Sequence, residues 1–253
     1  MVKEEKTAAY WDRKWALKKQ RLRENVILDG SDGEQEFDEE LQSVARGKKV
    51  LDVGCGPGEF TLIIARKAKS VVGIDTSQTA LALAEKGLAT VPIKNASFRF
   101  GDIRRLPFPG ESFDLVYSRR GPASDSRRCL SEVFRILRRE GIFLEITIGE
   151  RDKQNLASIF GRGQKLGYRG QVSSVKKRWL KEVGFREATA RDYLGTEIFH
   201  SVDDLVVRLR SAPIIPSFDP VKDRPFLERV KEECTTDRGV ETSVHRVVLT
   251  ARK

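Results

Sequence analysis

The sequence is poor in the residues that build disulfide bonds and metal sites. It has three cysteines and two histidines among 253 residues. Cys55, Cys129 and Cys234 lie far apart and form no C-x-x-C pair, which excludes a disulfide framework or a zinc cluster as an organising feature. His200 and His245 lack the spacing of metal ligands. We therefore expect no metal site and a reducing compartment, the cytoplasm.

Long apolar stretches are also absent. No uncharged stretch approaches the roughly 18 residues that a membrane-spanning helix needs. The N-terminal residues MVKEEKTAAYWDRKW lack the apolar core of a signal peptide. We expect a soluble protein with no membrane partner and with enough residues for one domain and a full core. The oligomeric state is left open.

Acidic residues are fewer than basic ones, at 37 against 47, which gives a net charge of +10 and favours an anionic partner. Residues 161–181 hold seven basic side chains and no acidic one, and residues 119–139 hold seven against two. Such runs are typical of a solvated charged face or of a surface that follows a phosphate backbone, so RNA is one candidate partner. A third run, within residues 13–23, consists of Arg13, Lys14, Lys18, Lys19, Arg21 and Arg23.

Apolar strands alternate with amphipathic helices through the middle of the chain. The alternation predicts an α/β protein with a doubly wound, mostly parallel sheet and helices on both faces. The predicted strands are 49–53, 70–74, 97–100, 113–118 and 141–148, and the predicted helices are 59–69, 77–88 and 126–137.

The two ends of the chain depart from this alternation. Residues 10–27 and 37–46 are expected to form helices, so residues 1–46 would be a basic, helical N-terminal extension of a domain at 47–253. After residue 148 we expect a helix at 174–183, a strand from Phe185, helices at 201–211 and 223–234, and a last strand at 243–251. The last pair of helices makes a helical insertion at about 195–240, before the last strand.

Three glycines follow the first predicted strand, in VLDVGCGPGEF at 50–60. Closely spaced glycines between a strand and a helix let a ligand approach the backbone. The Gly-Lys-Ser/Thr ending of a phosphate-binding loop is missing. A dinucleotide site would need a glycine where Glu59 stands, and an anionic side chain there would sit poorly beside pyrophosphate. The loop favours a ligand with an adenosine end and no phosphate, such as S-adenosylmethionine.

Four pieces of the sequence, in order, resemble the class I S-adenosylmethionine-dependent methyltransferases, most strongly over residues 47–150. LDVGCGPG is similar to the first motif of that family, and Asp75, 21 residues after Gly54, is similar to its acidic residue at the end of the second strand. FRFGDIRRLPF and FDLVYS, the latter at 113–118, are similar to the segments that border the adenine and the acceptor.

The resemblance implies an enzyme with a Rossmann-like, seven-stranded sheet and S-adenosylmethionine as its cofactor. Asp75 would accept hydrogen bonds from both ribose hydroxyls, a role that needs two acceptor oxygens. Asp102 and Ile103 would contact the adenine, and Asp52 would help to hold the methionine end. Cys55 is expected to be a small filler instead of a nucleophile. The predicted cofactor-binding residues are Asp52, Gly54, Cys55, Gly56, Gly58, Asp75, Thr76, Asp102, Ile103 and Ser118.

The resemblance places the acceptor beside the loop SRRGP at 118–122. This loop lacks the patterns of enzymes that methylate adenine, glutamine amides or cytosine C5. Arg119 and Arg120 are predicted to position the acceptor, because a guanidinium fork binds phosphate or carboxylate; the alternative is that they point to solvent. Tyr10 and Trp11, with Trp15 nearby, are predicted to bind substrate by stacking or else to pack a helix.

Three hypotheses for the function follow. The first is an RNA methyltransferase that modifies a base nitrogen or ribose oxygen of structured ribosomal or transfer RNA. The second is a small-molecule O- or N-methyltransferase with the insertion as a lid, in which Ile214, Ile215, Pro216 and Phe218 either line a pocket or pack on the sheet. The third is a cofactor-binding fold used only as a binding module.

Overall fold

The computed structural model describes residues 7–17, 26–164 and 166–253, and these form a mixed sheet with helices on both faces. Five parallel strands make one half of the sheet, in the order β6-β5-β2-β3-β4. They are β2 (Lys49–Val53), β3 (Ser70–Asp75), β4 (Ala96–Phe100), β5 (Phe113–Arg119) and β6 (Leu137–Ile148). The predicted doubly wound α/β fold is confirmed in this half.

The other half of the sheet is antiparallel. β9 (Gly239–Arg252) pairs with β6, β7 (Arg186–Phe199) pairs with β9, and β1 (Val26–Gly30) pairs with β7. β8 (Thr235–Thr236) adds a short hairpin to β9, so the described sheet has nine strands where seven were expected. Residues 26 and 27 were predicted to be helical and instead lie in β1. All five residues of β1 are exposed, so its side chains carry no alternating pattern, and the backbone ladder to β7 defines the strand.

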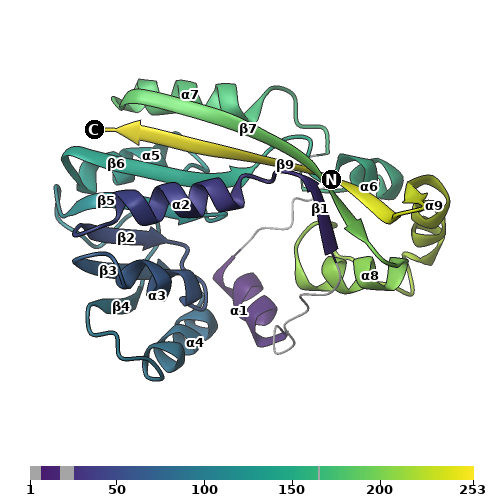
Figure 1. Ribbon diagram of the computed structural model, residues 1–253, viewed down its shortest axis with the longest axis horizontal. Helices are drawn as coiled ribbons and strands as arrows, with labels where there is room; N and C mark the ends of the chain where they lie inside the picture. Colours follow the sequence, from purple (N-terminus) through teal and green to yellow (C-terminus); the bar gives the residue numbers. More distant parts are fainter. Residues whose placement is uncertain (1–6, 18–25, 165) are drawn as a thin grey trace.

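Two sets of helices cover the two faces (Figure 1). On one face α2 (Glu34–Val44) and α3 (Glu59–Ala65) bury Phe37, Leu41 and Ile64 against the sheet, with α4 (Gln78–Leu88) beside α3. On the other face α5 (Arg127–Ile136) and α7 (Val172–Val183) bury Leu130 and Leu180. The carboxyl ends of the parallel strands therefore lie between two packed layers, where such sheets bind ligands.

Three helices form a second apolar cluster, which we call the helical lobe: α6 (Gln154–Phe160), α8 (Val202–Ser211) and α9 (Arg224–Cys234). The helical insertion before the last strand is confirmed, whereas α6 was not predicted. Ile214 and Ile215 are buried in this lobe, Phe218 packs against it and Pro216 is half-buried, so these residues contribute to the core of the lobe. β9 pairs with β6 only from Arg246 onward, and its first half continues past β6 to the helical lobe.

Candidate cofactor and acceptor site

The glycine loop after β2 has a backbone that only glycine adopts easily. Gly54, Gly56 and Gly58 have φ of 75°, 53° and 76°. A Cβ on Gly54 would lie 3.0 Å from Cδ of Pro122, and one on Gly58 would lie 2.4 Å from Cζ of Phe98. Since both conformation and packing exclude a side chain, the loop brings bare backbone to the carboxyl end of the sheet.

Asp75, the last residue of β3, holds this loop in place. Its Oδ2 accepts a hydrogen bond from the Gly56 N–H (2.9 Å), and its Oδ1 accepts one from the Ser77 N–H (2.9 Å). Burial raises the pKa of Asp75, although these backbone bonds favour the carboxylate. Each carboxylate oxygen has a second acceptor site, so Asp75 can still accept from two hydroxyl groups. Thr76 follows it, half-buried, before α4.

Asp52 lies in β2 behind the loop and is buried. Its Oδ2 accepts hydrogen bonds from the hydroxyls of Thr61 (2.6 Å) and Tyr117 (2.7 Å). Burial raises the pKa of Asp52 to about 6, against the opposing effect of these two hydrogen bonds. A cationic ammonium group near Asp52 would favour its ionised form, which fits the methionine end of the predicted cofactor.

The remaining predicted cofactor residues lie around the same loop. Ser118 is buried and donates its hydroxyl to the carbonyl of Val53 (2.8 Å). Burial raises the pKa of the Cys55 thiol, so this residue lacks the thiolate of a nucleophile. Asp102 forms an ion pair with Arg104 (2.5 Å), which lowers its pKa, and Ile103 is largely buried in the core. The adenine roles of Asp102 and Ile103 remain predictions.

Helix α1 (Ala8–Leu17) lies against the glycine loop and α4. A Cβ on Gly56 would lie 2.9 Å from the Trp15 ring, and Asp12 accepts hydrogen bonds from the Ser77 hydroxyl (2.6 Å) and the Thr79 N–H (3.0 Å). Lys14 Nζ donates to the carbonyl of Arg210, at the end of α8 (3.2 Å). The helix thus reaches from the cofactor loop to the helical lobe. Within it, the buried ring of Tyr10 packs edge-on against Trp11.

The two arginines of the acceptor loop have carboxylate partners on α2. Arg119 binds Glu34 (2.5 Å) and Asp38 (3.1 Å), and its guanidinium lies 4.9 Å from the centre of the Phe60 ring. Arg120 binds the other oxygen of Glu34 (3.2 Å). The acidic residues lie about eighty positions earlier in the chain, within the acidic stretch at 29–40, which is the only sequence signal for this pairing.

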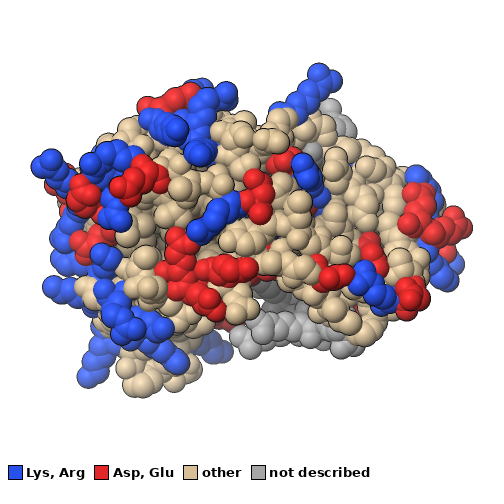
Figure 2. All heavy atoms as spheres, turned by 45° about the horizontal axis from the view of Figure 1, so that its top comes forward, with Lys and Arg blue, Asp and Glu red and all other residues tan. Residues whose placement is uncertain are grey.

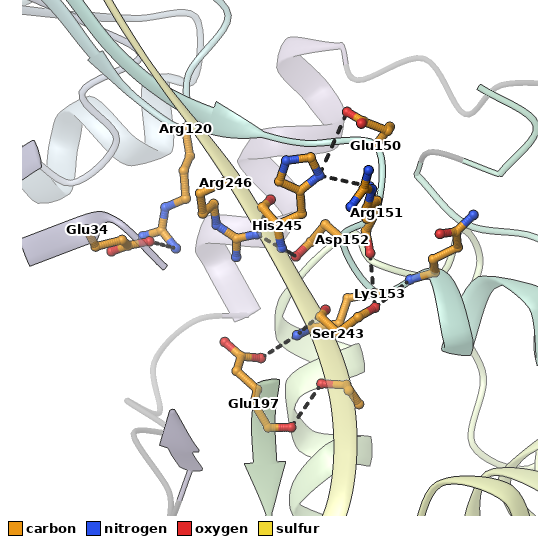
Figure 3. Close-up of polar contacts among 12 residues, drawn as sticks. Glu34, Arg120, Glu150, Arg151, Asp152, Lys153, Glu197, Ser243, His245 and Arg246 are labelled. Atoms are coloured by element: carbon orange, nitrogen blue, oxygen red, sulfur yellow. Dashed lines mark hydrogen bonds and ion pairs between the residues drawn. The ribbon is translucent and has the colours of Figure 1, made fainter. Parts of the chain in front are cut away.

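A buried polar network that the sequence analysis missed continues from Arg120 along β9 (Figure 3). Arg246, 5% exposed, donates to Asp152 (2.5 Å), and Lys153 binds Glu197 (2.7 Å). Nδ1 of His245 accepts from the Arg151 N–H (3.1 Å) and Nε2 lies 2.8 Å from Asp192. Both ring nitrogens of His245 are therefore engaged, which suits a structural role better than proton transfer.

Seven of the described basic residues in the predicted runs form ion pairs with acidic side chains. Figure 2 shows basic side chains gathered mainly at the left end of the face in view and acidic side chains through its middle and right. Lys18, Lys19, Arg21, Arg23 and Lys165 lie outside the described residues, whereas Arg169, Lys177 and Lys181 are exposed. The ion pairs of the runs include Arg127–Glu182, Arg135–Glu132, Arg138–Asp114, Arg162–Asp223 and Arg178–Glu182.

Two searches of the described residues gave negative results. None of their helices is long and apolar enough to cross a membrane. Nor do their histidine, cysteine, aspartate and glutamate side chains form a group of three or more that could hold a metal ion.

Comparison with known proteins agrees with the glycine-loop geometry. A family model described as a methyltransferase domain matches residues 45–184. The demethylmenaquinone methyltransferase of Thermotoga maritima is 31% identical over 185 residues, which are 69% of this chain and 73% of that protein. The structure of YcgJ from Bacillus subtilis is 18% identical, with a TM-score of 0.66 over 87% of this chain and 98% of that one. Phosphoethanolamine N-methyltransferase 2 of Haemonchus contortus, in complex with S-adenosylmethionine, is 17% identical, with a TM-score of 0.56 over 87% of this chain and 52% of that one.

Proposed function

Since the chain belongs to the class I S-adenosylmethionine-dependent methyltransferases, we propose that it methylates an oxygen or nitrogen atom of a small molecule. The cofactor is S-adenosylmethionine, whose sulfonium supplies an already activated methyl group. The residues of the chain then need to hold the acceptor in line with that group and to exclude water.

The observation that carries this proposal is the position of α1. Trp15 and Asp12 attach it to the glycine loop and α4, and Lys14 attaches it to α8. A helix that connects the cofactor loop to the helical lobe would border a bound acceptor, as suits a small molecule. A polynucleotide would need an open basic groove, and the pairing of Arg119 and Arg120 with Glu34 and Asp38 supports the small-molecule alternative over RNA.

The cofactor-binding roles of Asp52, Asp75 and the three glycines are part of the proposal, as is the division into an extension at 1–46 and a domain at 47–253. Support for the roles comes from the acceptor capacity of Asp75 and from the bare backbone at Gly54 and Gly56. Positioning of the acceptor by Arg119 and Arg120 would act through the ion-paired guanidinium groups described above.

The test is transfer of radiolabelled methyl from S-adenosylmethionine into a small-metabolite extract and, separately, into total RNA. We expect label in the metabolite fraction with the wild-type protein and none with Asp75→Ala. Label in RNA alone would reinstate the RNA hypothesis. Label in neither fraction, together with tight binding of the cofactor, would favour a binding module.

A further inference from the structure

Five cationic side chains gather on the acceptor side of the glycine loop. We call them the arginine cluster: Arg119 and Arg120 after β5, Lys153 before α6, Arg208 on α8 and Arg246 on β9. The cluster adjoins the cofactor loop, because Gly121 and Pro122, which directly follow Arg120, contact Gly54. Its members come from both the parallel half of the sheet and the helical lobe.

The carboxylates in this cluster are shared. Glu34 receives Arg119 on one oxygen and Arg120 on the other. Glu197 receives Lys153 on one oxygen and Arg208 on the other, at 3.3 Å. Asp38 also binds Arg119 and Asp152 binds Arg246, so four carboxylates serve five cations and one positive charge is in excess.

Two guanidinium donors of the cluster lack an acceptor. The Nε atoms of Arg208 and Arg246 are buried and have no hydrogen-bond partner among the described residues. An unpaired buried N–H of a charged group is costly, and native proteins seldom leave one without a ligand or water. Ion pairs connect the two arginines: Arg246 binds Asp152, and the next residue, Lys153, shares Glu197 with Arg208.

The backbone conformation of Arg120 places its side chain beside Arg246. Arg120 has a φ of 63°, in the left-handed region that a residue with a side chain seldom adopts, and its N–H binds the carbonyl of Ile146 (2.8 Å). Figure 3 shows its guanidinium between Glu34 and Arg246. Burial and the positive charges of Arg119, Arg246 and Arg208 lower its pKa, against the pull of Glu34. Like charges that face each other in this way are stabilised by an anion between them.

We propose that Arg208 and Arg246, with Arg120 beside them, bind an oxyanion on the methyl acceptor, either a carboxylate or a phosphate monoester. Guanidinium N–H groups match the oxygens of both anions. The anionic end of the acceptor would lie against β9 and α8, and the nucleophilic atom would face the cofactor loop. This inference rests on the proposed small-molecule function and narrows its substrates to acidic compounds.

The test is anion binding by the full-length protein saturated with S-adenosylhomocysteine. Inorganic phosphate and acetate are titrated separately by calorimetry at constant ionic strength, with sodium chloride as the balance. Arg208→Met keeps the apolar stem and leaves Lys153 on Glu197, so the fold should survive; circular dichroism checks it. We expect this variant to bind the preferred anion about tenfold more weakly or worse. Arg210→Met, on the exposed side of the same helix, is the matched control and should bind like wild type.

Each outcome decides the proposal. Preference for phosphate would identify a phosphate monoester and preference for acetate a carboxylate. Failure of both anions to bind, or equal binding by Arg208→Met and wild type, would overturn it. If Arg208→Met does not fold, Arg208→Lys replaces it, with the same expectation because lysine lacks the Nε donor. Methyl transfer confined to neutral metabolites would overturn the anion site and leave the proposed function intact. Anion binding without any methyl transfer would support the anion site and overturn the proposed function.

Discussion

Asp75 shows how one side chain can serve both the loop and its ligand. It fixes Gly56 and Ser77 through one acceptor site on each oxygen and keeps the other sites for hydroxyl groups. The glycine loop could be predicted from the spacing of its glycines, because backbone positions with positive φ favour glycine. The partners of Arg119 and Arg120 could not, because Glu34 and Asp38 come from another element more than eighty residues away.

We predict that Asp75→Ala weakens binding of S-adenosylhomocysteine by about a hundredfold or more, because the two hydrogen bonds from the ribose hydroxyls to a charged acceptor contribute roughly 1.5–3 kcal/mol each. Calorimetric titration measures the change. Asp237→Ala, at an exposed position, is the control and should bind like wild type. Unchanged affinity in Asp75→Ala would refute the ribose role.

The pKa of Asp52 predicts a pH dependence of cofactor binding. Burial raises this pKa to about 6, so Asp52 is mostly neutral at pH 5 and mostly ionised at pH 7. The ammonium group of S-adenosylhomocysteine favours the carboxylate, so the dissociation constant should fall by about tenfold between pH 5 and pH 7.

Asp52→Asn should remove this pH dependence. Glu145→Gln is the matched control, since Glu145 is also buried and burial raises its pKa to about 7. That variant should keep the dependence. A flat profile in the wild-type protein, or a slope that survives in Asp52→Asn, would show that Asp52 does not hold the ammonium group.

At the scale of elements, α1 is attached to its neighbours by polar contacts from its middle, through Asp12 and Lys14. Asp12 accepts from Ser77, whose own hydroxyl accepts the Ala80 N–H and so caps α4. The hydroxyl of Ser77 and the N–H of Thr79 lower the pKa of Asp12, in keeping with a carboxylate that stays charged. The attachment of α1 and the start of α4 are therefore parts of one hydrogen-bonded unit.

We predict that Asp12→Ala loosens α1 without unfolding the domain. Loss of a capping-type contact of about 1 kcal/mol should speed amide hydrogen exchange at 8–17 by roughly fivefold. Mass spectrometry of exchanged peptides measures this. Glu85→Ala, on the exposed face of α4, should leave exchange in α1 unchanged. Equal exchange in both variants would mean that Asp12 does not fasten the helix.

The elements differ in how well the sequence predicts them, for physical reasons. β2, β3, β5 and most of β6 are buried, and their apolar runs predict them directly. β4 lies at the edge of the sheet and buries only Phe98. β1 is exposed along its whole length, so only its partner β7 defines it. α6 buries Leu156 and Phe160 in the helical lobe, but its seven residues are too few for a helical period to stand out.

At the scale of the whole molecule, a net charge of +10 does not amount to a binding surface. Several basic side chains form ion pairs with carboxylates of the same chain, among them Arg127, Arg135, Arg138 and Arg162. Basic runs are visible in the sequence, whereas the acidic partners of Arg127, Arg138 and Arg162 become their neighbours only in the fold. The sequence therefore overstates how much positive charge an external polyanion would meet.

We predict only weak binding of RNA, with a dissociation constant above about 1 µM at 200 mM salt for mixed transfer RNA. Filter binding measures this constant. Lys177→Glu with Lys181→Glu, which reverses two exposed charges of a basic run, should make little difference. Submicromolar binding that this double variant weakens would contradict the small-molecule proposal.

The length of β7 and β9 limits how the molecule can open. Their ladder runs unbroken from Thr189 opposite Thr250 to Phe199 opposite Val240, through the sheet and into the helical lobe. A hinge between the sheet and the helical lobe would have to break this ladder, so we expect the two to move as one rigid body. The element beside the cofactor loop that could move more easily is α1, which side-chain hydrogen bonds attach to α4 and α8. The rate of turnover would then be set by the release of α1 from its contacts instead of by the closing of two domains.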